Sequence, residues 1–379
     1  MSASRTYLDH NATAPLRPEA YAAMTAAMSL CGNPSSVHHE GRRARAIIET
    51  AREQVAKLVN AKPLEVVFTS GATEANAWVA GSGDWATILS AEIEHDSVRG
   101  PVANTSATLL PLPVSTDGMV AVEEIARYAL CSPAADGRTL VMLQAANNET
   151  GILQPVAGVA AFARAHDLHI HTDAVQMPGR MAIDFADLGV DTLSLSSHKI
   201  GGPAGAGALV IRDGVTLSSF LTGGGQERRR RAGTENLIGI AGFGAAAEAA
   251  HKDAAASTRL GALRDRLETG IREITPSAII VGDGSPRLPN TTSVAIPGQP
   301  AETLVIKLDL AGVAVSAGAA CSSGKVGASH VLTAMGLAPE IATGAIRLSL
   351  GWNSSEADVA AFLNVWGDVT RSRILRAVA

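Results

Sequence analysis

Aromatic residues are scarce in this chain of 379 residues: they make up 3% of it, whereas hydrophobic residues of all kinds make up 46%. A core with so few rings must be built from Ala, Val, Leu and Ile, and abundant glycine allows backbone segments to approach closely. This composition is typical of a globular α/β protein. At about 100–200 residues per domain, the length suggests two domains.

Cysteine is also rare. The three cysteines, Cys31, Cys131 and Cys321, have unrelated spacings. An odd number at such spacings argues against a disulfide framework and against a zinc ribbon. A cysteine with a function in this chain would therefore act as a free thiol.

Positive charge and long apolar runs are lacking as well. The formal net charge is −5 at pH 7, which argues against broad attraction to nucleic acid or to an anionic membrane surface. The four arginines at 228–231 form a short run without aromatic neighbours, so they do not change this view. The N-terminus has no signal-like stretch, and no run is apolar over the ~18 residues of a membrane span. We therefore expect a cytoplasmic protein with no direct nucleic-acid or membrane partner.

Short apolar strands alternate with helical stretches through the first part of the chain. This alternation predicts a mainly parallel, seven-stranded sheet that is covered on both faces. The predicted strands are 66–69, 86–89, 108–112, 140–144, 168–172, 192–195 and 208–211, and the first two predicted helices are 17–30 and 40–60.

The pattern changes near residue 250. A polar helix over 251–274 and further strands at 278–281, 292–296, 313–316 and 346–350 predict a smaller α+β domain. We divide the chain into an N-terminal arm (1–15) that packs with the small domain, a large domain (16–250) and the small C-terminal domain (251–379).

Polar residues stand where two neighbouring strands should end. Asp173 and Gln176 follow one strand, and Lys199 follows the next, directly before Gly201-Gly202-Pro203. Because the carboxyl ends of parallel strands face one crevice, we expect the acid, the amide and the lysine to share a pocket. This trio suits pyridoxal phosphate (PLP): the lysine can bind its aldehyde, and the carboxylate keeps the pyridine nitrogen protonated.

The motifs Ser-Ser-His-Lys199 and Asp173-Ala-Val-Gln176 resemble the cofactor site of the class V, fold-type I PLP-dependent enzymes, and among them that of the cysteine desulfurases of the NifS/IscS kind. The resemblance extends from Tyr7 to Trp352, with the motifs in family order. It implies a fold-type I transferase that uses PLP to remove sulfur from L-cysteine, giving L-alanine.

The same resemblance assigns roles around the cofactor. It implies that His95 stacks on the ring and moves protons, and that Asn148 and Gln176 donate to the phenolate oxygen. Gly71 to Glu74 follows a strand and opens a helix, which is a good anion site, and it matches the family's phosphate site. The implied phosphate ligands are Ala72, Thr73, Ser196, His198 and, from the partner subunit of a homodimer, Thr234.

Cys321 lies among small residues in the stretch from Val315 to His330, so we expect an exposed, mobile thiol. The stretch resembles the desulfurase loop whose cysteine takes the sulfur as a persulfide and passes it to an acceptor protein, for iron–sulfur cluster assembly or thiolation. The chain departs from the family at 325–328, where relatives commonly carry an acid and a proline, and at Ala14, where many have threonine.

The resemblance also implies two ligands for the carboxylate of the substrate. Arg347 should bind it through both guanidinium nitrogens, in a way that lysine could not copy. Asn33 matches a family residue at the same carboxylate.

Three alternatives remain open. One strand face would carry His169, His171 and Asp173, an arrangement that could bind the metal ion of a zinc or iron hydrolase. Nevertheless, we predict no metal site. A related class V enzyme, such as a selenocysteine lyase or an aminotransferase, would share everything except dependence on the thiol. A non-catalytic sulfur scaffold would keep the fold without using the lysine.

Overall fold

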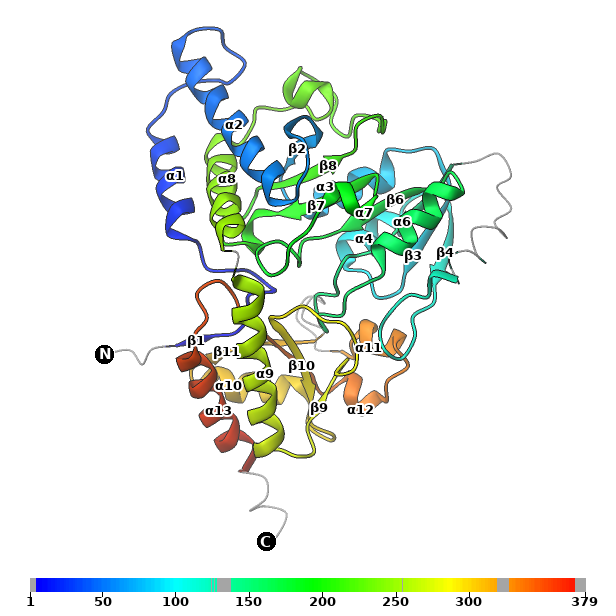
Figure 1. The fold of residues 1–379 in the computed structure, drawn as a ribbon, viewed down its shortest axis with the longest axis vertical. Coiled ribbons are helices and arrows are strands. Elements are labelled where there is room, and N and C mark those ends of the chain that lie inside the picture. Colours follow the sequence, from blue (N-terminus) through cyan, green and yellow to red (C-terminus); the bar gives the residue numbers. More distant parts are fainter. Residues whose placement is uncertain are drawn as a thin grey trace.

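The structure, a computed structural model, describes residues 5–123, 125, 127, 138–253, 255–318 and 327–371. The described residues form three β-sheets. The largest lies in the N-terminal part of the chain, and a smaller one lies in the C-terminal part (Figure 1). No helix in these described ranges is long and apolar enough to cross a membrane.

The larger sheet has seven strands in the order β2-β8-β7-β6-β5-β3-β4. Strand β8 runs antiparallel to both of its neighbours, and every other pair is parallel. The prediction of a mainly parallel, seven-stranded sheet is therefore confirmed. The strands are β2 (Val66–Thr69), β3 (Trp85–Ala91), β4 (Thr108–Leu112), β5 (Arg138–Met142), β6 (His169–Asp173), β7 (Thr192–Ser196) and β8 (Gly207–Ile211).

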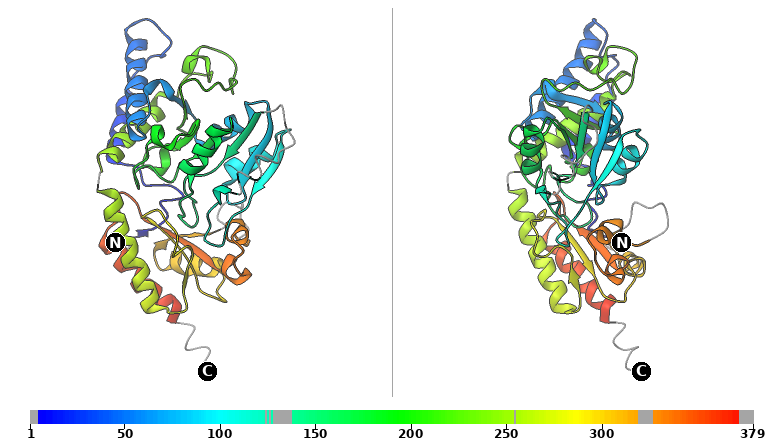
Figure 2. Two further views of the ribbon diagram at one scale, coloured as in Figure 1. Left: turned by 45° about the vertical axis from the view of Figure 1, so that its right-hand side comes forward. Right: turned by 90° about the vertical axis from the view of Figure 1, so that its right-hand side faces the viewer.

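Each face of this sheet buries its own apolar cluster, because successive strand residues point to opposite sides. Ile88 and Leu140 pack with helices α3 and α4, whereas Leu89 and Val141 pack with α2, α6, α7 and α8. Helices thus cover both faces (Figure 2). The helices are α1 (Pro18–Met28), α2 (His39–Leu58), α3 (Ala72–Gly81), α4 (Asp96–Ala103), α6 (Val156–Ala165), α7 (Phe185–Leu188) and α8 (Leu237–Lys252).

The smaller sheet has the order β12-β13-β10-β9 and packs on helices α9, α10 and α13. The N-terminal arm joins this part of the chain: its strand β1 (Thr6–Tyr7) pairs in parallel with β11, and Leu8 is fully buried in the same apolar cluster. The remaining elements are β9 (Ile279–Ile280), β10 (Thr291–Ala295), β11 (Val313–Ala314), β12 (Ser316–Ala317), β13 (Ala345–Ser349), α9 (Ala256–Ile274), α10 (Ala301–Leu310), α11 (His330–Ala334), α12 (Pro339–Ala342) and α13 (Glu356–Arg371).

One predicted helix begins too early. The polar helix predicted over 251–274 is α9, which ends at Ile274 as predicted but begins at Ala256, since residues 251 and 252 belong to α8. Asp253 separates the two helices with a non-helical backbone (φ −80°, ψ 67°), and its carboxylate pairs with Arg259 at 3.4 Å. The break lets α8 pack on the larger sheet and α9 on the smaller one.

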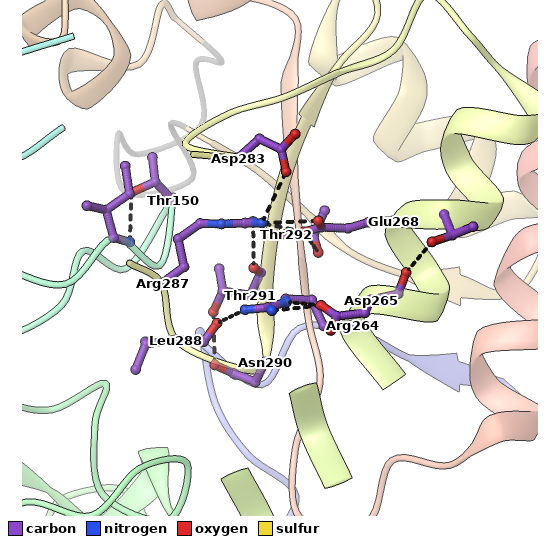
Figure 3. Close-up of polar contacts among 12 residues, drawn as sticks. Thr150, Arg264, Asp265, Glu268, Asp283, Arg287, Leu288, Asn290, Thr291 and Thr292 are labelled. Carbon is purple, nitrogen blue, oxygen red and sulfur yellow. Dashed lines mark hydrogen bonds and ion pairs between the residues drawn. The ribbon is translucent and has the colours of Figure 1, made fainter. Parts of the chain in front are cut away.

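A buried polar cluster fastens α9 to β10 (Figure 3). Arg287 donates to both carboxylate oxygens of Glu268, at 2.8 and 3.1 Å, and Thr292 Oγ1 donates to Glu268 at 2.9 Å. The side chains of Arg287 and Glu268 are each only 5% exposed. Because a buried charge needs a partner, this arrangement fixes α9 on β10, the strand that contains Thr292.

A strained loop between β8 and α8 is held by a second buried ion pair. The backbone of this loop has φ values of 45°, 56° and 65° at Glu227, Arg228 and Arg229. Residues other than glycine rarely adopt such left-handed conformations. Arg52 on α2 donates to both oxygens of Glu227 at 2.8 Å, and Phe68 N donates to Glu227 at 2.9 Å. These contacts hold the backbone in its left-handed form.

Replacing Glu227 with alanine should lower the free energy of unfolding by about 3–5 kcal/mol, because it leaves the Arg52 guanidinium buried without its carboxylate. Urea unfolding measures the change. The matched control is Glu356→Ala, which breaks an exposed pair with Arg266 and should cost less than about 1 kcal/mol. Equal effects of the two variants would contradict the role given to the buried pair.

Candidate active site

A pocket of about 490 Å³ is lined by residues that follow strands β3, β5, β6 and β7. These four strands are mutually parallel neighbours, so their carboxyl ends meet at one edge of the sheet. Ten of the residues predicted to act in the site line this pocket: Ala72, Thr73, His95, Asn148, Asp173, Gln176, Ser196, His198, Lys199 and Arg347.

Three of the predicted site residues are not among these. Asn33 is exposed in its own loop, where its Oδ1 accepts from Ser35 N at 2.8 Å. Thr234 is exposed and does not line the pocket of its own chain. Cys321 lies outside the described residues, as do Cys131 and Lys325. The roles of Asn33, Thr234 and Cys321 therefore stay predictions.

Asp173 is held at the end of β6 by directed hydrogen bonds. Its Oδ2 accepts from Asn76 Nδ2 at 2.7 Å, and its Oδ1 accepts from Val175 N at 3.1 Å. Behind it, His171 Nε2 contacts Asn76 Oδ1 at 2.9 Å, and His171 Nδ1 contacts Thr192 Oγ1 at 2.8 Å. The chain of contacts fixes the direction in which the Asp173 carboxylate faces the pocket.

The same contacts argue against the metal alternative. Both ring nitrogens of His171 are used inside the protein, and burial lowers its pKa to about 3, so the ring is neutral. His169 is instead near Asp191, at 3.8 Å. Across the described ranges, no group of three His, Cys, Asp or Glu side chains is placed to hold a metal ion.

His95 stands between β3 and α4, as the N-cap of that helix. Its Nδ1 accepts from Ser97 N at 3.0 Å, so the proton of the neutral ring is on Nε2. Burial lowers the pKa of His95, the nearby Asp173 carboxylate raises it, and Lys199 lowers it further. The histidine can therefore serve as a neutral proton carrier on the pocket wall.

Lys199 ends the short turn that follows β7. Its ammonium donates to the carbonyl oxygens of Asn11 and Ala12, both from the N-terminal arm. Its neighbour His198 has a pKa lowered to about 4, chiefly by burial and also by Lys199 and Arg180. Near neutral pH His198 is uncharged, so it can bind an anion only through an N–H donor.

Asn11, which the sequence analysis did not single out, connects the pocket to the smaller sheet. Its Nδ2 donates to Asn148 O at 3.1 Å and to Thr291 Oγ1 at 2.9 Å. Its carbonyl accepts from Gln176 Nε2 at 3.2 Å and from Lys199. No local pattern marks this residue, because its partners are far away in the sequence.

Arg347 lies on β13, lines the pocket and is 3% exposed. It donates to Asp9 Oδ1 at 2.7 Å and to Asn148 O at 3.1 Å. Its Nε is buried and has no hydrogen-bond partner in the structure. A buried guanidinium with an unused N–H suits an anionic ligand such as a carboxylate.

The N-terminus of α3 also lines the pocket, through Gly71, Ala72 and Thr73. Its N-cap is Gly71, and no side chain caps the helix. Gly207 packs so tightly here that a Cβ on it would lie 2.6 Å from Gly71 Cα. An uncapped helix N-terminus is a ready anion site.

These features fit PLP. The open helix N-terminus, with Ser196 and His198, is a site for a phosphate, and the fixed Asp173 carboxylate can meet a pyridinium nitrogen. Lys199 lines the same pocket and carries an amine of the kind that binds the aldehyde.

The comparisons with known proteins agree with this geometry. The aminotransferase class-V family model matches residues 6–362. The chain is 42% identical to a cysteine desulfurase of Cereibacter sphaeroides (95% of this chain, 94% of that protein) and 38% identical to the cysteine desulfurase IscS of Dictyoglomus turgidum (95% and 93%). A NifS-like protein from Rickettsia africae superimposes with a TM-score of 0.88 at 33% identity, over 97% of this chain and 99% of that one.

With matches that run nearly end to end in both sequence and structure, this chain belongs to the class-V aminotransferase family and, within it, to the cysteine desulfurases of the NifS/IscS type.

Proposed function

We propose that this protein is a PLP-dependent cysteine desulfurase that converts L-cysteine into L-alanine and keeps the sulfur as a persulfide on Cys321. Enzymes of this family use PLP, and this chain is accordingly a PLP-dependent enzyme. The observation that carries the proposal is the convergence of Lys199, Asp173 and Arg347 on one pocket beside an uncapped helix N-terminus.

Bound there, PLP supplies an electron sink that weakens bonds at the substrate carbons next to the amine. Asp173 would hold its ring nitrogen, and Asn148 and Gln176 its phenolate oxygen. Ala72, Thr73, Ser196 and His198 would hold the phosphate. All of these residues line the pocket.

The chain's own groups then bind the substrate and move protons. Arg347 would bind and orient the substrate carboxylate through its charge and its Nε–H, since Nη1 and Nη2 already donate to Asn148 O and Asp9. Lys199 Nζ takes and returns the proton at the substrate α-carbon. His95 Nε2 carries the proton that passes between the substrate sulfur and the pocket, since its Nδ1 is occupied by Ser97 N.

The sulfur step needs no outside oxidant. The Cys321 thiolate attacks the substrate sulfur, forming an S–S bond while the substrate C–S bond breaks. The electron pair of that bond stays with the substrate carbon, which takes up a proton and becomes the methyl group of alanine. Cysteine and the protein thiol therefore yield alanine and a protein persulfide, with all atoms accounted for.

A homodimer with shared sites and an acceptor protein complete the proposal. Thr234 is exposed at the end of the loop that Glu227 holds, which suits a contact with the phosphate in the partner subunit. Light scattering of the purified protein tests the dimer: a monomer that binds PLP and turns over cysteine at full rate would contradict it. A cytoplasmic location and the identity of the acceptor stay predictions.

Incubation with L-cysteine and a thiol reductant tests the function. The expected result is release of alanine and sulfide in equal amounts, without any 2-oxo acid. Turnover that requires a 2-oxo acid as amino-group acceptor would favour an aminotransferase. Activity on selenocysteine but none on cysteine would favour a selenocysteine lyase.

Replacing Arg347 with lysine should lower kcat/KM for L-cysteine about 10- to 100-fold, mainly through a higher KM, because an ammonium keeps the charge but loses the second hydrogen bond to the carboxylate. Steady-state kinetics measure the change, and the absorption spectrum of bound PLP should stay as in the unmodified enzyme. An unchanged KM would show that Arg347 does not bind the substrate.

A further inference from the structure

The side chain of Asn11, on the N-terminal arm, belongs to a closed ring of hydrogen bonds. Its Nδ2 donates to Thr291 Oγ1 at 2.9 Å, Thr291 Oγ1 donates to Asn290 Oδ1 at 3.0 Å, and Asn290 Nδ2 donates back to Asn11 Oδ1 at 3.0 Å. All three residues are buried, with at most 1% of their surface exposed. Because each amide nitrogen in the ring donates and each amide oxygen accepts, the ring fixes the orientation of the Asn11 amide.

The same amide supports Arg347. Asn11 Nδ2 also donates to Asn148 O at 3.1 Å, and this carbonyl is the one that accepts from Arg347 Nη1, again at 3.1 Å. The main-chain N–H of Asn11 donates at 2.9 Å to the hydroxyl of Ser349, which lies on β13 with Arg347. Asn11 thus holds both the carbonyl that Arg347 contacts and the strand that carries Arg347.

The main-chain carbonyl of Asn11 makes contacts on the other side of the pocket. It accepts from Gln176 Nε2 at 3.2 Å and from Lys199 Nζ. Gln176 and Lys199 follow strands β6 and β7 of the seven-stranded sheet, whereas Ser349 and Arg347 lie in the smaller sheet. Asn11 therefore connects the lysine of one part of the chain to the arginine of the other.

We propose that Asn11 is a positioning residue that sets the spacing between Lys199 and Arg347, so that the amine and the carboxylate of one amino acid can be bound together. This inference rests on the proposed function, in which the substrate amine takes the place of Lys199 on PLP and Arg347 binds the carboxylate. Both groups of the substrate are attached to one carbon atom, so their separation is nearly fixed. A displaced guanidinium would therefore lose the carboxylate.

Two ligands that differ only in the carboxylate test this spacing. L-Alanine, the product, carries its amine and its carboxylate on one carbon, and propan-2-amine has a methyl group in place of the carboxylate. Titration calorimetry of the holoenzyme measures the dissociation constant of each. The ratio of the two constants shows how well Arg347 meets the carboxylate of a ligand whose amine is bound at PLP.

Replacing Asn11 with alanine removes the side-chain bonds but keeps the main-chain groups that contact Ser349 and Lys199. The dissociation constant of L-alanine should rise about 10-fold, and that of propan-2-amine should stay within about 2-fold. Asn11→Ser is a second variant that keeps a polar group in the buried site. Its single hydroxyl hydrogen cannot donate to Asn148 O and Thr291 Oγ1 together, so we expect the same selective loss.

The matched control is a buried amide outside the pocket. Gln154 joins two other residues, since its Nε2 donates to Gly118 O at 2.7 Å and its Oε1 accepts from Val120 N at 3.0 Å. It does not line the pocket. Gln154→Ala should therefore leave both dissociation constants unchanged.

The inference would be overturned if the Asn11 variants bound L-alanine as tightly as the unmodified enzyme does. It would also be overturned if they lost both ligands by the same factor, because Asn11 would then support the pocket as a whole and not the spacing within it. Failure of the proposed function looks different: the unmodified enzyme itself would then bind L-alanine no better than propan-2-amine, or would form no alanine from L-cysteine.

Discussion

Replacing Lys199 with alanine should reduce the conversion of L-cysteine to alanine by roughly 10⁴-fold or more, since it removes both the amine that binds PLP and the base that moves the substrate proton. Lys199 is placed for both tasks: it ends the turn after β7, in the pocket that also contains Asp173 and His95. Alanine formation measures the loss.

A second measurement identifies the lysine directly. Borohydride treatment of the holoenzyme should attach PLP covalently to the peptide that contains Lys199, and Lys199→Ala should not be labelled. The control is Lys252→Ala, on the exposed end of α8, where the side chain is 70% exposed; it should keep full activity and full labelling. Near-normal turnover by Lys199→Ala would rule out the assigned role.

Replacing Cys321 with serine should lower alanine formation by roughly 10³-fold or more, because a hydroxyl is far less able than a thiolate to take up the substrate sulfur. Binding of PLP and of L-cysteine should persist, since the residues that line the pocket stay in place. Steady-state kinetics measure the loss of alanine formation, and the PLP spectrum shows whether PLP and L-cysteine still bind.

The other cysteines provide the control for this variant. Cys31 is an exposed free thiol that does not line the pocket, so Cys31→Ser changes the same functional group outside the pocket. It should leave turnover unchanged. If Cys321→Ser turns over cysteine as fast as Cys31→Ser, the protein is a class V enzyme that works without a thiol, and the selenocysteine lyase or aminotransferase alternative gains support.

Much of the fold follows from local pattern. The strands predicted at 66–69 and 108–112 coincide with β2 and β4, because short apolar runs bounded by turns leave little choice of conformation. The start of the helix predicted from 251 was wrong, since the break at Asp253 depends on a contact with Arg259 and on the separate packing of α8 and α9. The spacing of apolar residues along the sequence does not reveal such a break.

The residues at the pocket also fall into those that a local pattern predicts and those that depend on distant contacts. Asp173, Gln176 and Lys199 could be assigned to one site because parallel strand ends converge, a rule that needs no knowledge of distant contacts. Asn11 could not, because its place at the pocket comes from partners such as Thr291, which is 280 positions away in the sequence. Tertiary contacts of this kind leave no local signal.

In the proposed mechanism, Lys199 and Cys321 serve one reaction on one substrate. A single turnover with L-cysteine, with no reductant present, tests this when alanine is counted and the cysteine peptides are weighed by mass spectrometry. Each alanine released should be matched by one additional sulfur atom on the peptide that contains Cys321. Alanine without that sulfur, or sulfur found on Cys31 or Cys131 instead, would contradict it.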